Sequence, residues 1–203
     1  MEITDFWKNC NGVALSGENR ISGFDCGNDD LNEFFNVDAI KYQEQMLGQT
    51  YFFQHTESQK IVCAFSLSPD SIKLTYLPNS RRKKVQELIP REKPLQTYPA
   101  FLIGRLGVAS DLKGKGIGSQ LIIFIKSFCL GEFPNFCRFL LLDAYNEPAV
   151  LSFYLKNEFK FVFSTEHQER EYYKKVNLDE PLRTRLMFYD MMLWKEKLVS
   201  INN

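Results

Sequence analysis

A glycine-rich segment at residues 113–118 is the part of this chain best suited to bind an anion. It stands between an apolar run at residues 100–108, which predicts a strand, and a stretch at 119–130 whose apolar face predicts a helix. The start of a helix offers unpaired amides and the positive end of the helix dipole. Glycines there permit positive φ and let a phosphate approach the backbone, while two lysines add compensating charge. The predicted phosphate-binding residues are Lys113, Gly114, Lys115, Gly116, Ile117, Gly118 and Ser119.

Three other interpretations of this segment differ in what they require. A simple glycine-rich turn would bind nothing. A Walker loop needs lysine followed by serine or threonine after its second glycine. Here Gly118 is followed by Ser119 and Gln120, which disfavours nucleoside triphosphate hydrolysis. A dinucleotide fold favours glycine or alanine where Leu121 stands, and only Asp143, at the end of the next predicted strand, keeps that alternative open.

With its flank, the segment resembles the coenzyme A motif of the GNAT acetyltransferases, which we place at residues 104–130. In that motif a basic or amide residue, two further residues and G-x-G follow a strand, and Lys113 takes the first place. A second match, a helix ending in phenylalanine-tyrosine, comprises Asn146, Ala149, Phe153, Tyr154 and Phe159.

This second match departs from the family at two points. Tyr154 follows Asn146 by eight residues where seven is usual, and Glu158 replaces the usual glycine before Phe159. Because asparagine tolerates positive φ better than most residues, we expect Asn157 to adopt the left-handed helix end that glycine normally provides.

The resemblance implies an acyl-CoA N-acetyltransferase with acetyl-CoA as co-substrate. In such a reaction the thioester oxygen gains negative charge and a thiolate leaves. The resemblance implies that the backbone amides of Leu106, Gly107 and Val108 bind this oxygen, with Gly107 allowing a bulge or close ligand approach. It also implies that Asn146 contacts the coenzyme and that Tyr154 protonates the thiolate. A core position is the structural alternative for Tyr154.

The base that removes the amine proton is not identified by the sequence. Asp143, Tyr145 and Glu147 follow a predicted strand and would approach the acetyl group, and a water relay is an equal alternative. Positioning of the two substrates alone can lower a barrier by roughly 7–11 kcal/mol, so a dedicated base is not required.

The pattern at residues 21–31, together with Gly48, Tyr98 and Pro99, resembles the toxin branch of this superfamily. Those relatives acetylate the amino group of aminoacyl-tRNA. The resemblance implies aminoacyl-tRNA as acceptor and a small antitoxin protein as partner. A small amine or a protein amine are alternative acceptors, and a catalytically silent coenzyme A-binding module is an alternative of another class. A homodimer is also left open.

The basic residues at 81–84, with Arg91 and Lys93, are candidates for contacts with RNA phosphates. An ordinary solvated helix is an equal alternative, because Glu87 and Glu92 dilute the cluster and the whole chain is neutral.

The composition is that of a globular protein without a strong net field, since 25 basic residues balance 25 acidic ones and 44% of residues are hydrophobic. The N-terminus lacks a leader pattern and no apolar run could span a membrane, so we expect a soluble, cytoplasmic protein. Five cysteines without a C-x-x-C pair predict buried reduced thiols. The isolated His55 and His167 predict no metal.

The resemblance implies an α/β (α+β) chain with the GNAT fold. This fold has a mixed, twisted central sheet with splayed central strands and helices on both faces, here in a single domain at 1–203. The expected elements are a helix capped by Asn28 or Asp29, a hairpin of 51–53 with 61–67, a loop at 69–99 with one short basic helix, a parallel βαβ unit at 100–142, a helix at 148–157, and strands at 159–163 and 187–193.

Overall fold

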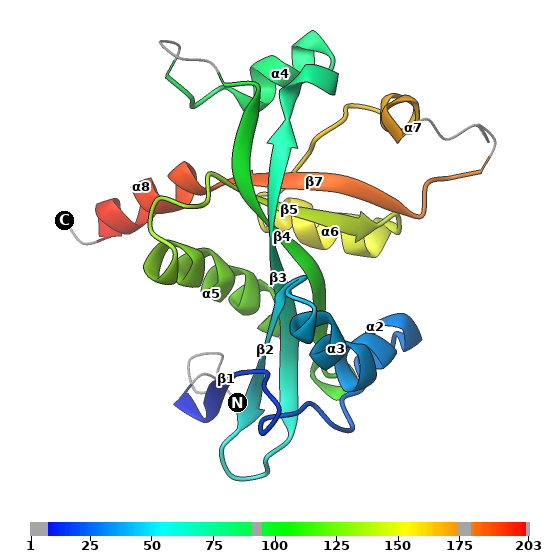
Figure 1. Ribbon diagram of the computed structural model, residues 1–203, viewed down its shortest axis with the longest axis vertical. Coiled ribbons are helices and arrows are strands. Elements are labelled where there is room, and N and C mark those ends of the chain that lie inside the picture. Colours follow the sequence, from blue (N-terminus) through cyan, green and yellow to red (C-terminus); the bar gives the residue numbers. More distant parts are fainter. Residues whose placement is uncertain (1–7, 91–94, 174–179, 202–203) are drawn as a thin grey trace. The chain divides into compact units, whose positions relative to one another are not determined.

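The computed structural model describes residues 8–90, 95–173 and 180–201 and contains a seven-stranded sheet of order β1-β2-β3-β4-β5-β7-β6 (Figure 1). β4 and β5 are parallel, whereas the pairs β1–β2, β2–β3, β5–β7 and β6–β7 are antiparallel. This mixed sheet confirms the predicted α/β class. The strands are β1 (Cys10–Ala14), β2 (Gln49–His55), β3 (Ile61–Lys73), β4 (Thr97–Val108), β5 (Phe139–Tyr145), β6 (Lys160–Phe161) and β7 (Thr184–Asp190).

Helices and single helical turns connect these strands. They are α2 (Asp29–Glu33), the π-helical turn η1 (Phe34–Asp38), α3 (Ala39–Glu44), the 3₁₀ turn η2 (Leu74–Tyr76), α4 (Asn79–Val85), the 3₁₀ turn η3 (Ser110–Leu112), α5 (Ile117–Glu132), α6 (Pro148–Lys156), α7 (Glu166–Tyr173) and α8 (Met191–Ile201). Within the described ranges, no helix is both long and apolar enough to cross a membrane.

The chain divides into two compact units, each assembled from two stretches of sequence. Unit 1 comprises Met1–Ser68 and Ile103–Phe124, and unit 2 comprises Pro69–Leu102 and Ile125–Asn203. The elements β3, β4 and α5 each contribute residues to both units. A single domain over residues 1–203 stays a prediction.

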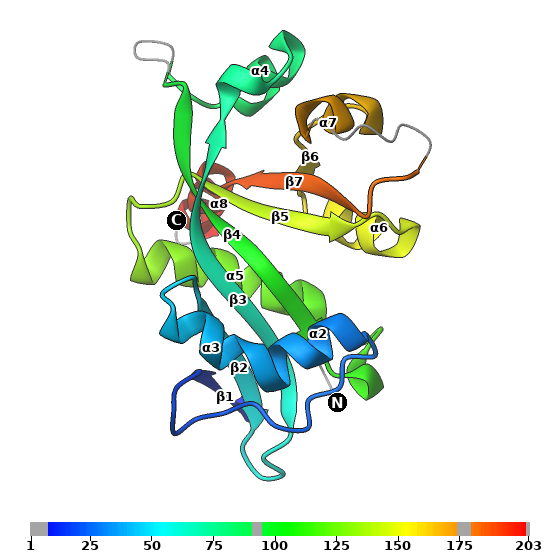
Figure 2. The ribbon, with the colours of Figure 1, turned by 45° about the vertical axis from the view of Figure 1, so that its right-hand side comes forward.

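Unit 1 packs the helical segment from α2 to α3 against the strands β2 and β3 (Figure 2). As predicted, Asn28 caps the segment, because its side-chain oxygen accepts a hydrogen bond of 3.0 Å from the amide of Leu31. The π-helical turn in the middle of the segment was not predicted. The buried core residues of this unit are Leu15, Ile21, Phe24, Cys26, Phe35, Ala39, Phe52, Ile61, Ala64 and Ala109.

Unit 2 is built on the long antiparallel ladder between β5 and β7, which lie side by side in both ribbon views (Figure 1, Figure 2). The ladder runs from the pair Phe139 and Asp190 to the pair Tyr145 and Thr184. Its apolar side chains meet residues from α4 and from the ends of β3 and β4. The buried core residues are Ile72, Leu74, Leu77, Val85, Tyr98, Ala100, Phe139, Leu141, Val162, Phe163 and Phe188.

Several sequence-based boundaries were wrong, and the predicted strand at 159–163 is only Lys160–Phe161. Two of the differences have a clear physical reason. β3 continues to Lys73, although Pro69 suggested a loop. The ladder with β2 ends at Leu67, so a proline two residues later removes no hydrogen bond to that strand. The predicted strand at 187–193 ends at Asp190, whose carboxylate accepts a hydrogen bond of 3.0 Å from the amide of Met192 and so caps α8.

The cysteines are free thiols, as predicted, and three of them are buried: Cys26, Cys63 and Cys129. Cys10 and Cys137 are partly exposed. Burial raises the pKa of the Cys63 thiol far above its usual value, so this group remains protonated and unreactive at neutral pH.

Candidate active site

Residues 113–116 of the predicted phosphate-binding segment form an exposed turn after η3, and Ile117, Gly118 and Ser119 are the first residues of α5. Gly114 and Gly116 have φ angles of 75° and 79°, which only glycine adopts at little cost. A Cβ atom placed on Gly114 would meet no atom within 4 Å, so the backbone is open to a ligand there. Lys113 and Lys115 are exposed beside it, whereas Ile117 is buried and anchors the helix start. The turn therefore fits a pyrophosphate group.

The N-terminal segment holds the start of this turn in place. The backbone oxygen of Asp25 accepts a hydrogen bond of 2.9 Å from the amide of Ser110, and its carboxylate accepts one of 3.1 Å from the Ser110 hydroxyl. Hydrogen bonds from the Gly27 amide, the Asn32 side chain and Ser110 lower the pKa of Asp25. Sequence analysis did not single out Asp25, although it lies within the pattern at 21–31 that suggested the toxin branch.

The three residues predicted to bind the thioester oxygen lie at the end of β4. The parallel ladder with β5 joins residues 100–102 to residues 139–141, and it does not use the backbone of Leu106, Gly107 or Val108. A Cβ atom on Gly107 would lie 3.1 Å from the Phe24 ring and 3.3 Å from the Phe35 ring. The close approach that requires glycine at 107 is thus made by two phenylalanines, which sequence analysis did not predict.

Tyr154 lies in the last turn of α6, and the end of this helix is a Schellman motif. The amide of Phe159 donates to the Tyr154 carbonyl at 3.0 Å, and the amide of Glu158 donates to the Leu155 carbonyl at 3.0 Å. The Tyr154 ring packs edge-on against Phe159 with centroids 5.7 Å apart. The side chain is partly exposed, and desolvation of the phenol raises its pKa above the ordinary value. The phenol is therefore protonated at neutral pH, as a proton donor must be.

The prediction that Asn157 adopts the left-handed conformation was wrong. Asn157 has a φ of −89°, and Glu158 has a φ of 69°. In a Schellman motif the left-handed residue is the one after the C-cap, and Asn157 is the C-cap. Its side-chain amide donates to the Phe153 carbonyl at 2.8 Å instead. Glutamate thus holds a conformation that glycine adopts more easily.

Asn146 follows β5, and its side-chain nitrogen is already paired. This nitrogen donates to the carbonyl oxygen of Leu182 at 2.9 Å and to the Glu166 carboxylate at 3.2 Å. Hydrogen bonds from the Leu182 amide and from Arg170 lower the pKa of Glu166 to about 2. A coenzyme contact through this nitrogen would therefore have to replace an existing hydrogen bond.

The candidate bases at the end of β5 differ in their surroundings. Asp143 is exposed although its neighbours in the strand are buried, Tyr145 packs against Arg183, and Glu147 is exposed just before α6. These observations select none of the three, and a water relay stays an alternative.

Three of the four side chains of the basic stretch at 81–84 form hydrogen bonds or ion pairs with neighbouring parts of the protein. Arg81 donates to the backbone carbonyls of Phe161 and Val162. Arg82 donates to those of Leu77 at 3.0 Å and Thr75 at 2.7 Å. Lys84 pairs with Glu87 at 2.9 Å. Arg91 and Lys93 lie outside the described residues. These bonds favour the structural interpretation of the stretch over RNA binding.

The described part of the chain holds no group of three or more histidine, cysteine or acidic residues able to bind a metal. His55 accepts a hydrogen bond of 3.3 Å from the Ser58 amide, and His167 lies 3.8 Å from Glu171.

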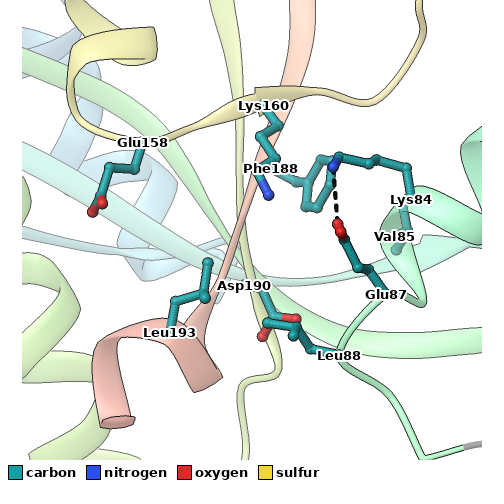
Figure 3. A pocket seen from close by; sticks show the side chains of 9 residues that line it. All are labelled: Lys84, Val85, Glu87, Leu88, Glu158, Lys160, Phe188, Asp190 and Leu193. Atoms are coloured by element: carbon teal, nitrogen blue, oxygen red, sulfur yellow. Dashed lines mark ion pairs between the residues drawn. The ribbon is translucent and has the colours of Figure 1, made fainter. Parts of the chain in front are cut away.

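A hollow beside α4 carries charged walls, but most of these charges are paired (Figure 3). Lys84 pairs with Glu87 on one wall, Asp190 pairs with Arg138 at 2.8 Å, and Glu158 pairs with Lys197 at 2.6 Å. Its lining residues are Lys84, Val85, Glu87, Leu88, Glu158, Lys160, Phe188, Asp190 and Leu193. None of the predicted catalytic or coenzyme-binding residues lines it.

Sequence analysis missed one residue near Tyr154, the buried Lys126 of α5. A signal was present, because Lys126 stands four residues after Ile122 and three before Cys129, at the spacing of the buried helix face. Its side chain is 3% exposed, and its ammonium donates to the Asn157 carbonyl at 3.0 Å.

No family model matches this chain, but solved structures match nearly all of it. A crystal structure of a tyrosine-to-phenylalanine mutant of KacT has a TM-score of 0.69 at 19% identity, covering 93% of this chain and 98% of that one. A mutant AtaT toxin bound to the C-terminus of the antitoxin AtaR and acetyl-CoA has a TM-score of 0.64 at 15% identity, covering 94% and 98%. AtaT complexed with acetyl-methionyl-tRNAfMet has a TM-score of 0.65 at 19% identity, covering 93% and 99%. The chain has the GNAT fold of these proteins, as the resemblance predicted.

Proposed function

We propose that this chain is an N-acetyltransferase that moves the acetyl group of acetyl-CoA to a primary amine. The observation that carries the proposal is the open turn at Gly114 and Gly116, with positive φ at both, which stands between a strand and a helix in a GNAT fold. A similar structure contains acetyl-CoA, which supports the same co-substrate here.

In this proposal the turn holds the pyrophosphate of the co-substrate. The amides at the start of α5 and the exposed ammonium groups of Lys113 and Lys115 supply positive charge for it. The backbone open at Gly114 gives the phosphate oxygens direct access to the chain. Leu106, Gly107 and Val108 supply the amides for the thioester oxygen, and Asn146 is retained as a weaker candidate contact.

The proposed reaction forms one bond and breaks one. The amine nitrogen attacks the thioester carbonyl carbon, so a carbon–nitrogen bond forms and the carbon–sulfur bond breaks. The amine proton leaves to water or to a base, and the thiolate takes a proton from the Tyr154 hydroxyl, which regains one from solvent. Tyr154 is protonated before each turnover, and its raised pKa makes it a weaker acid toward the thiolate than a free phenol.

The amino group of aminoacyl-tRNA is the acceptor that we favour. AtaT, which has the same fold, is found with acetyl-methionyl-tRNAfMet. In this chain the N-terminal pattern typical of the toxin branch holds the phosphate-binding turn through Asp25 and Ser110. A toxin of this kind would be controlled by a small antitoxin protein, and an AtaT structure contains the antitoxin AtaR.

The test is to incubate the purified protein with acetyl-CoA labelled in the acetyl group and, separately, with aminoacyl-tRNA, polyamines and peptides. We expect label in the aminoacyl-tRNA, on the amino group of the amino acid. Label confined to polyamines or peptides would contradict the tRNA acceptor and keep the acetyltransferase. Label in none of them would favour a silent coenzyme A-binding module.

A further inference from the structure

The Schellman motif at the end of α6 connects Tyr154 to three charged residues that the proposed reaction does not use. The carbonyl of Tyr154 accepts the Phe159 amide, and the two rings are in contact, so the position of Tyr154 depends on the conformation of residues 157–159. This conformation requires the positive φ of Glu158. A non-glycine residue in this conformation is strained, and the strain persists when the surrounding structure enforces it.

Three contacts enforce it, and they come from α5 and α8. Lys126 donates to the Asn157 carbonyl at 3.0 Å, and its Nζ atom lies 3.8 Å from the Glu158 carboxylate. Lys197 donates to both carboxylate oxygens of Glu158, at 2.6 Å and 2.7 Å. The backbone and the side chain of the left-handed segment are thus both held by ammonium groups.

We propose that Lys126 is a positioning residue for Tyr154, because its ammonium, with Lys197, holds Glu158 in the left-handed conformation that ends α6. We call Lys126, Glu158 and Lys197 the charged clamp. The inference rests on the proposed function, in which Tyr154 protonates the leaving thiolate.

Burial of the Lys126 ammonium costs desolvation free energy, which a residue with a purely structural role would not need to overcome. The whole residue is 2% exposed, and its Nζ atom lies 3.5 Å from the centre of the Tyr189 ring and 5.7 Å from that of Phe159. Contact with aromatic faces returns only part of the desolvation free energy of a buried ammonium. A methionine of similar length would fill the same space without this penalty. The charge itself is therefore the feature that needs an explanation.

Burial lowers the pKa of Lys126 from 10.5 to about 8, with Glu158 opposing the shift and Lys197 adding to it. Another titratable group close to the ammonium is the Tyr189 phenol of β7, whose pKa is raised by burial. Asp190, next to it in the chain, pairs with Arg138. The clamp is thus charged at neutral pH and loses the charge of Lys126 in mildly alkaline solution.

The test compares Lys126→Met, Glu158→Gly and the double variant with the wild-type protein. Glycine at 158 adopts positive φ without help, so it should make the ammonium of Lys126 dispensable. Turnover of the labelled acceptor and binding of acetyl-CoA are measured from pH 6.5 to 9.5. Hydrogen exchange at the Phe159 amide, which donates to Tyr154, reports the helix end without any need for activity.

For Lys126→Met we expect kcat to fall about tenfold, with KM for acetyl-CoA within about twofold, because a misplaced donor slows the chemical step. Exchange at Phe159 should rise about tenfold, while exchange at Leu151, in the first turn of α6, should not change. The wild-type alkaline loss of kcat near pH 8 should be absent in Lys126→Met. Adding Glu158→Gly should restore kcat to within about threefold of the wild type.

A kcat within twofold of the wild type, or unchanged exchange at Phe159, would overturn the inference. If Lys126→Met does not fold, the comparison of the wild-type protein with Glu158→Gly still tests the inference. A loss of kcat near pH 8 that is equally large in Glu158→Gly would also overturn it. Tyr154→Phe distinguishes a failure of the proposed function from a failure of the inference about the charged clamp. Full turnover in that variant refutes the role of Tyr154, whereas lost turnover there with normal Lys126→Met refutes only the clamp.

Discussion

The ammonium of Lys126 donates a hydrogen bond of 3.0 Å to the carbonyl of Asn157, the residue that caps the helix of Tyr154. This contact joins a buried charge on α5 to the helix end where Tyr154 packs against Phe159. The motif that this sequence resembles has glycine where this chain has Glu158. In this chain the ion pairs of the charged clamp therefore hold a positive φ that glycine would adopt without help. This difference has measurable consequences.

Gly116→Glu should abolish binding of acetyl-CoA. The substitution places a side chain at a φ of 79° and a negative charge where the pyrophosphate would lie. Calorimetric titration of the folded variant measures the affinity, with circular dichroism as the check on folding. Gly17→Glu is the matched control, because Gly17 is exposed in the same unit and a Cβ atom there meets nothing within 4 Å. Equal affinity in the two variants would remove the phosphate site from this turn.

Gly107→Ala should destabilise the protein by about 1–3 kcal/mol, because its methyl group would press on the rings of Phe24 and Phe35. Urea denaturation measures the change. Phe24→Leu, added to Gly107→Ala, should recover part of the loss, since the two sites are in contact. Gly131→Ala, at an open helical position, should not destabilise the protein. Additive losses at positions 107 and 24 would show that the packing explanation is wrong.

Lys126 should make stability and activity respond to pH in opposite directions. Its pKa is about 8 in the fold and 10.5 ordinarily, so between these values the unfolded chain binds more protons than the folded one. The unfolding free energy of the wild type relative to Lys126→Met should therefore rise with pH across this window, by about 3 kcal/mol in total. Urea denaturation of both proteins at pH 7, 8, 9 and 10 gives this difference. A flat difference would place the pKa of Lys126 near its ordinary value.

Tyr154→Phe should lower kcat at least about 100-fold and leave the affinity for acetyl-CoA within about twofold. The change removes the hydroxyl and keeps the ring that packs on Phe159, so the helix end should persist. Tyr42→Phe is the matched control, because Tyr42 is 41% exposed and keeps its ring contact with Phe34. Steady-state turnover and calorimetry on the same preparations separate chemistry from binding. Wild-type turnover in Tyr154→Phe would exclude this residue as the proton donor.

Local patterns predicted much of the fold. The strand before Lys113, the helix after Gly118 and the cap at Asn28 depend on neighbours in sequence, and the structure has all three. The extension of β3 beyond Pro69 could not be predicted in the same way. It depends on the ladder between β2 and β3 ending at Leu67, before the proline, and this depends on a distant part of the chain.

The site shows the same division. Positive φ at Gly114 and Gly116 follows from residue type, whereas the reason for Gly107 lies in Phe24 and Phe35, far away in sequence. The left-handed residue was predicted one position too early. Asparagine tolerates positive φ better than glutamate, but Asn157 is the C-cap, and the left-handed residue follows the C-cap. The burial of Lys126 could be predicted from its helical spacing, but its partners could not, because they come from the residues after α6 and from β7 and α8.

The most direct test of the central claim measures free thiol and N-acetylated amine together, after wild-type protein is mixed with acetyl-CoA and aminoacyl-tRNA or, in parallel, other amines. We predict that one thiol appears for each amine acetylated, that both need the amine, and that Gly116→Glu abolishes both. Acetyl-CoA that binds but releases no thiol with any amine would contradict the assignment and leave a coenzyme-binding protein without acetyltransferase activity.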